Sequence, residues 1–144
     1  MKTLKITIIG LLLLVTFGAA KANTVKDGGN EMVSVNYSIN TYVSAISRGR
    51  VKDVTDLLSD NLKYSIQRGN KILVFNKSQY IESAKNDQNV QQDCLVTTSV
   101  AESTSDVMIV KVDMKYADVT RTNYVTLVNQ DNGWKITNIY SVFK

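Results

Sequence analysis

The spacing of apolar residues predicts helices at the start of the soluble part of the chain and strands after them. One stripe repeats at three- and four-residue intervals, at Val35, Ile39, Tyr42, Val43 and Ile46. This is the spacing of a single helix face, so we expect a helix of about four turns from about Glu31, closed by Gly49. A second, short helix should follow directly, with its buried side formed by Val51, Val54, Leu57 and Leu58.

A hairpin and a third helix are expected next. Leu62, Tyr64 and Ile66 alternate with polar residues, which is typical of a half-buried strand. The Gly69-Asn70 pair is a turn signal, so residues 71–75 should return as the hairpin partner. Asn76 followed three residues later by Gln79 resembles a capping pair, and it predicts a helix to about residue 85 that buries Tyr80, Ile81 and Ala84.

Four longer strands are predicted for the rest of the chain, at about 90–101, 107–117, 119–129 and 134–143. The second has the clearest alternation, with one face formed by Met108, Val110, Val112, Met114 and Tyr116. Asn132-Gly133 is a strong hairpin turn between the last two strands. Helices followed by a run of antiparallel strands predict an α+β fold, with three helices packed on one face of a curved, mostly antiparallel sheet.

The N-terminal residues have the pattern of a secretory signal peptide. Lys2 and Lys5 precede an uncharged apolar stretch at 6–17, and Ala20-Lys21-Ala22 fits the small-residue cleavage pattern. The uncharged run 6–20 is shorter than the ~20 apolar residues that a membrane-spanning helix needs, which favours cleavage over an anchor. We expect a signal peptide at 1–22, a flexible lead-in at 23–30 and one domain at 31–144, in the periplasm or secreted.

Removing that segment changes the charge and the classes of partner. The chain has 17 basic and 13 acidic residues, and three of the basic ones are Lys2, Lys5 and Lys21. The remaining 122 residues therefore carry 14 basic against 13 acidic side chains, a net charge of +1. Such a domain gives no electrostatic reason to expect nucleic acid or, after cleavage, a membrane as partner. The single cysteine, Cys94, cannot form an internal disulfide and is interpreted as a small buried hydrophobe in a strand.

Two groups of residues resemble a known superfamily. One is Tyr42-x3-Ile46-x2-Gly49 followed by Val54-x2-Leu57-Leu58-x-Asp60-x3-Tyr64, and the other is Tyr124-x2-Leu127-Val128-x4-Gly133-Trp134-Lys135-Ile136 with Ile139-Tyr140. In order and spacing they resemble nuclear transport factor 2-like domains, and most of all small exported bacterial proteins labelled "putative lumazine-binding". The resemblance implies a cone-shaped (cystatin-like) fold over residues 31–143. It also implies a pocket inside the cone and frequent pairing as a homodimer through the sheet.

Apart from one tyrosine, the catalytic residues of that superfamily have no counterparts here. The steroid isomerase branch uses a helix tyrosine, an aspartate base and a second acid. The resemblance places Tyr42 on the tyrosine and Ile66 where the base stands, while the second acid falls near Tyr124, Val125 or Thr126. The chain has no histidine, which removes the histidine–aspartate pairs of the dehydratase and cyclase branches. We find no nucleotide-binding or nucleophile motif, so no cofactor and no catalytic residue is predicted. The acidic residues are scattered, which predicts no metal site.

Aromatic residues are the remaining candidates for a site. Inside a cone, aromatic rings can stack on a flat ligand while phenol groups orient it, although the same residues can serve as ordinary core. The candidate ligand-binding residues are Tyr42, Tyr64, Ile66, Tyr116, Val125, Trp134 and Tyr140. Three functions stay open at this point. They are a non-enzymatic domain that binds a small apolar or aromatic molecule, a structural or homodimeric interaction module with a filled cone, and an enzyme of unrecognised chemistry.

The signal peptide gives a direct prediction. Intact-mass measurement of the protein purified from its source organism should give a chain that begins at Asn23, because Ala20 and Ala22 present the cleavage pattern. Replacing Ala22 with a bulky residue such as Trp should leave the segment attached. A wild-type mass that includes residues 1–22 would contradict the prediction.

Overall fold

The computed structural model describes residues 34–144. The predicted signal peptide, the lead-in at 23–30 and the expected helix start at Glu31 lie outside the described residues. Within them, the elements follow in the predicted order. They are α1 (Val35–Arg48), α2 (Val51–Thr55), β1 (Leu58–Arg68), β2 (Lys71–Phe75), α3 (Lys77–Lys85), β3 (Leu95–Ser103), β4 (Val107–Lys115), β5 (Thr120–Gln130) and β6 (Gly133–Phe143).

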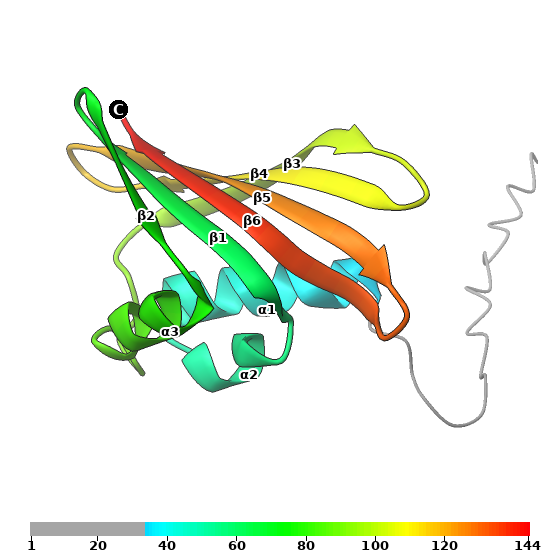
Figure 1. Cartoon of the computed structure of the whole chain (residues 1–144). Helices are drawn as coiled ribbons and strands as arrows, with labels where there is room; N and C mark the ends of the chain where they lie inside the picture. Colours follow the sequence, from blue (N-terminus) through cyan, green and yellow to red (C-terminus); the bar gives the residue numbers. More distant parts are fainter. Residues whose placement is uncertain (1–33) are drawn as a thin grey trace, which may run out of the picture.

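The six strands form one curved sheet in the order β2-β1-β6-β5-β4-β3, and the three helices lie on one side of it (Figure 1). Every neighbouring pair is antiparallel except β1 and β6, which run parallel. Irregularities in register interrupt three pairings, among them β5 with β6 between Thr126 and Leu127. Such bulges bend strands and increase twist, which helps the sheet curve around the helices. The fold is therefore α+β with a curved, unclosed, mostly antiparallel sheet, as predicted.

Strand alternation decides which side chains face the helices. On β5 the inward series is Arg121, Asn123, Val125 and Leu127, and each is paired with an inward residue of β6. With residues of the helices these form one core, in which Tyr42, Val112, Leu127 and Ile139 are at most 1% exposed. Burying each such side chain stabilises the fold by about 1.5–3 kcal/mol. The inner face of the sheet is therefore closed by helices, whereas the outer face is uncovered by the described residues.

Hydrogen bonds fix the helices at their N-terminal ends and against the sheet. Ser34 caps α1 by accepting from the backbone N–H of Tyr37, and Asn76 and Gln79 form the predicted reciprocal capping box of α3. Ser38 on α1 donates to the carbonyl of Trp134 on β6 at 3.0 Å.

None of the helices in residues 34–144 combines the length and apolar character needed to cross a membrane.

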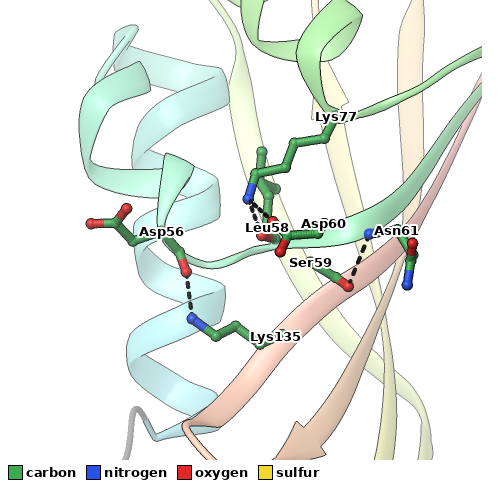
Figure 2. Close-up of polar contacts among 7 residues, drawn as sticks. All are labelled: Asp56, Leu58, Ser59, Asp60, Asn61, Lys77 and Lys135. Carbon is green, nitrogen blue, oxygen red and sulfur yellow. Dashed lines mark hydrogen bonds and ion pairs between the residues drawn. The ribbon is translucent and has the colours of Figure 1, made fainter.

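Two lysines tie the segment between α2 and β1 to its neighbours (Figure 2). Lys77, the first residue of α3, donates to the carbonyl of Leu58 at 2.8 Å and pairs with the Asp60 carboxylate at 2.9 Å. Lys135 on β6 donates to the carbonyl of Asp56 at 2.5 Å. Lys135 thus satisfies the carbonyl of the C-cap residue of α2, a group that a helix end otherwise leaves unpaired, whereas Lys77 binds the first carbonyl of β1.

Two predicted boundaries differ from the structure for identifiable reasons. The second helix ends at Thr55, and Leu58 already belongs to β1, because the chain must turn there to enter the sheet beside β6. The strand predicted from residue 90 begins at Leu95 instead. Residues 86–92 form a loop that bonds to the end of α1: Asn89 donates to the Gly49 carbonyl at 3.0 Å and Gln92 to the Ser47 carbonyl at 2.8 Å.

Gly49 is the position where the loop and α1 meet. Its φ of +67° lies in the left-handed region, and a Cβ there would clash with the carbonyl oxygen of Asp87 and lie 2.5 Å from the amide nitrogen of Asn89. Both neighbours are backbone atoms, so neither can rotate away. Gly49 thus allows the loop at 86–92 to approach the C-terminal end of α1 closely.

We expect Gly49→Ala to lower the free energy of unfolding by about 3 kcal/mol or more, because a left-handed backbone penalty and a steric clash add together. Gly69→Ala is the matched control: Gly69 has a φ of +58°, but a methyl group added to its Cα would meet no atom within 4 Å. It should cost only about 1–2 kcal/mol. Urea unfolding measures both values, and equal losses would contradict the close approach.

Candidate functional site

A small cavity lies between the inner face of the sheet and the helices. Its volume is about 80 Å³, and residues from all three helices, the loop after α3, and strands β1 and β5 line it. The lining residues are Ala45, Ile46, Val51, Val54, Tyr64, Tyr80, Ser83, Ala84, Asp87 and Arg121. Larger hollows of about 390 to 560 Å³ lie at the exterior surface, where polar and charged residues form much of the lining. The small cavity is therefore the candidate site, because it reaches the core.

Arg121 brings a positive charge to the wall of this cavity. It occupies an inward position of β5, where its Nη2 donates to the Tyr64 hydroxyl and its Nε donates to Asn123 Oδ1, each at 3.1 Å. Within residues 34–144, no carboxylate oxygen lies within 4.0 Å of its guanidinium. Burial lowers the pKa of Arg121, and the neighbouring tyrosines raise it. Together the tyrosines outweigh burial, so the pKa of Arg121 lies above its ordinary value. The side chain therefore stays charged and has only neutral partners.

Asn123 holds this guanidinium in place. It is fully buried, and its Oδ1 accepts from Arg121 Nε and also from Ser141 Oγ at 2.5 Å. Its amide group donates to the sulfur of Met114 at 3.8 Å. A buried amide fixed on three sides has little freedom, so the orientation of the arginine is set by the strand pairing of β4, β5 and β6.

Tyrosines surround the arginine from the other side. Tyr64 on β1 and Tyr80 on α3 meet edge to face with ring centroids 5.0 Å apart, and Phe75 lies 5.8 Å from Tyr64. Burial raises the pKa of Tyr80 and raises that of Tyr42 well above its usual range. The Tyr42 hydroxyl is buried and has no hydrogen-bond partner among the described residues. The cluster is aromatic, neutral apart from Arg121, and contains an unsatisfied donor.

Comparison with known proteins identifies the family of this chain. The family model described as "Putative lumazine-binding" matches residues 30–141, most of the chain. The chain belongs to this family. No curated protein matches the chain.

Solved structures agree on the fold. A nuclear transport factor 2-like protein of unknown function from Silicibacter pomeroyi is 16% identical, with 76% of this chain and 90% of that chain covered and a TM-score of 0.61. A nuclear transport factor 2-like protein from Cytophaga hutchinsonii is 17% identical, with 73% of this chain and 91% of that chain covered and a TM-score of 0.59. A ketosteroid isomerase-like protein from Erwinia carotovora atroseptica is 14% identical, with 80% of this chain and 97% of that chain covered and a TM-score of 0.59. This member of the "Putative lumazine-binding" family thus has the nuclear transport factor 2-like fold, as the sequence predicted.

Four of the seven predicted ligand-binding residues face the inside of the cone. Tyr64 lines the cavity, and Tyr42 lies beside it in the buried cluster. Ile66, the next inward residue of β1, and Val125 on β5 are packed in the core next to the cluster. Of the three positions considered near a second acid, Val125 faces inward, whereas Tyr124 and Thr126 alternate to the outer face.

The other three predicted residues lie elsewhere. Trp134 packs at the far end of the core, where its carbonyl accepts from Ser38. Tyr116 follows the end of β4 and donates to Gln92 of the loop at 3.1 Å. Cys94 lies beside Tyr116. It is half-buried and precedes β3, whereas the sequence predicted that it lies within a strand. Tyr140 lies on the outer face of the sheet and donates to Gln67 at 2.9 Å. The structure therefore does not bring these three together with the cavity.

Sequence reasoning missed Arg121, Tyr80 and Asp87 as parts of the site. Tyr80 was predicted to be buried, but nothing in the pattern of α3 distinguishes a cavity wall from core. Arg121 was not singled out from the sequence, and arginine is mostly exposed in proteins. Its alternation with Asn123, Val125 and Leu127 was the available signal.

In residues 34–144, no three acidic, cysteine or histidine side chains are placed to hold a metal ion.

The buried tyrosines predict a pH dependence. Because the pKa values of Tyr42 and Tyr80 are raised in the folded chain above the ordinary ~10, their burial stabilises the fold below about pH 10, and this stabilisation is lost as the pH rises further. Absorbance at 295 nm should show two tyrosines that ionise only as the protein unfolds. Tyr42→Phe and Tyr80→Phe should each remove one of them. Ionisation of all seven tyrosines near pH 10 with an intact fold would contradict this.

Proposed function

We propose that this domain binds a small molecule in the cavity between the helices and the inner face of the sheet. The observation that carries the proposal is the cavity beside Arg121, a charged group with only neutral partners. A buried charge without an opposite charge is costly, so proteins rarely keep one at a site that has no use for it. The family description supports ligand binding in general.

The size of the cavity limits what enters it. A volume of about 80 Å³ is about half that of a cavity known to hold benzene, ~150 Å³, and corresponds to two or three water molecules. A group of about three non-hydrogen atoms fits as the structure stands. A flat ring system would need α3 or the loop at 86–92 to move outward. Apart from Arg121, Ser83 and Asp87, the lining residues are apolar or aromatic, which suits a ligand with an apolar part.

A second function, pairing as a homodimer, is supported by the outer face of the sheet. Tyr124 and Tyr140 are register partners there, and Ile72 and Val74 on the edge strand β2 are 57% and 55% exposed. The same face carries both signs of charge, because Lys111 pairs with Asp113 at 2.8 Å. A face that combines exposed apolar side chains with charges of both signs suits a second copy of the same chain. Pairing there would leave the cavity on the opposite side accessible.

We also propose that the domain works outside the cytoplasm. The pattern of residues 1–22 supports export, and a ligand site in an exported domain would meet molecules of the periplasm or the surroundings.

Native mass spectrometry tests the binding proposal. The protein purified from its source organism should carry a small molecule that denaturation releases. Ala84→Leu, which adds three carbon atoms at the cavity wall, should lose that molecule while the circular dichroism spectrum stays unchanged. Ala101→Leu on the exposed part of β3 is the matched control and should keep it.

Two results would contradict the proposals. A wild-type protein with no bound mass, or one whose bound mass survives in Ala84→Leu, would exclude the cavity as the ligand site. The same spectrum reports the assembly: a mass of one subunit at micromolar concentration would contradict the homodimer.

A further inference from the structure

We propose that the cavity beside Arg121 receives the carboxylate group of a small organic acid, whose apolar part contacts the helix side chains around it. The inference rests on the proposed ligand binding and names the chemical class of the ligand. Four features carry it: the uncompensated charge, the free donors of the guanidinium, its fixed orientation and the size of the cavity.

The charge comes first. Arg121 is largely removed from solvent, and its partners Tyr64 and Asn123 are neutral acceptors. Buried arginines are ordinarily paired with a carboxylate, and breaking such a pair is strongly unfavourable. An anion that enters the cavity would supply the missing partner.

The donors of the guanidinium are arranged for such a group. Arginine has five N–H donors, and the described residues use two of them, Nε and one N–H of Nη2. The two N–H groups of Nη1 and the second N–H of Nη2 have no acceptor within residues 34–144. Nη1 and Nη2 together form the planar fork that binds the two oxygens of a carboxylate with parallel hydrogen bonds.

The orientation of this fork is set before any ligand arrives. Tyr64 accepts from Nη2 of the guanidinium and Asn123 accepts from Nε, and Asn123 is held in turn by Ser141. A donor pair that is already ordered loses little conformational entropy when it binds. This arrangement favours recognition of one anionic group over loose attraction to any anion.

The volume fits the same chemistry. A carboxylate has three non-hydrogen atoms, and the cavity of about 80 Å³ has the room of two or three water molecules. Around it, Ala45, Ile46 and Val54 are apolar, and the Tyr80 ring forms part of the wall. The acid should therefore be small and partly aliphatic rather than a polyanion.

Asp87 is the main rival for the arginine. It lies just after the end of α3, is exposed and also lines the cavity, but its carboxylate is more than 4.0 Å from the guanidinium. If Asp87 moved inward it could act as an internal counter-ion and displace an external acid. Removing its charge should then strengthen binding of the acid, whereas a site built for a cationic ligand would lose binding.

The experiment is an NMR titration of the mature protein, dialysed until its mass spectrum shows no bound molecule, with acetate and propionate as probes and acetamide and propionamide as neutral controls of the same shape. Each carboxylate should bind at least tenfold more tightly than its amide, because only the carboxylate pairs with the guanidinium charge. Arg121→Gln should reduce carboxylate binding to the level of the amide.

Two matched variants separate charge from position. Arg68 and Arg121 lie near the same Phe143 ring, with guanidinium carbons 6.0 Å and 5.9 Å from the ring centroid. Arg68 does not line the cavity, so Arg68→Gln should leave binding unchanged. Asp87→Asn should bind the acids as tightly or more tightly. The comparison of acid with amide in the wild-type protein stands even if Arg121→Gln fails to fold.

The outcomes distinguish the two proposals. Amides that bind as well as the carboxylates would overturn the organic-acid inference and leave ligand binding in the cavity intact. Loss of binding in Asp87→Asn would also overturn it, because the acidic residue would then be the anchor. Failure of both acids and both amides to bind would overturn this inference and weaken the proposed cavity as a site for small ligands.

Discussion

The partly buried charge of Arg121 is the constraint around which the polar groups inside this domain are arranged. A guanidinium on the inner face of β5 needs acceptors, and they come from two strands: Tyr64 of β1 and Asn123 of β5 itself, whose amide oxygen also accepts from Ser141 of β6. Tyr64 lies within reach of Arg121 because β1 pairs with β6, so that a single strand separates β1 from β5. The strand order and the polar cluster are therefore two aspects of one arrangement.

The helices complete that arrangement by closing the concave side. Tyr42 and Tyr80 bring rings and neutral hydroxyls from α1 and α3, while Gly49 lets the loop after α3 approach the end of α1 and form the rim of the cavity. The space that remains is small because these aromatic side chains fill most of the cone. The result resembles both of the leading sequence-based hypotheses, since the cone is largely filled and yet keeps a pocket beside a charge.

Periodicity predicted the elements and the fold, because alternation and helical spacing report directly which side of an element is buried. The inward tyrosines Tyr42 and Tyr64 were predicted correctly for that reason, and the capping box was predicted correctly because Asn76 and Gln79 have the local spacing that such a box requires. The start of β3 was not, because the long-range bonds of residues 86–92 to α1 leave no local pattern. Arg121 was missed because its inward position conflicts with the ordinary preference of arginine for solvent, and Tyr140 was assigned to the pocket although its phase along β6 faces outward.

A crystal structure of the protein purified from its source organism, at neutral pH and without carboxylate buffers, tests the account most directly. We expect an acidic group of a bound molecule within hydrogen-bonding distance of Nη1 and Nη2 of Arg121, with Tyr64 and Asn123 in the positions described above. An Asp87 side chain turned inward and paired with Arg121, in a cavity that holds no other molecule, would contradict it, because the charge would then be balanced by the chain itself.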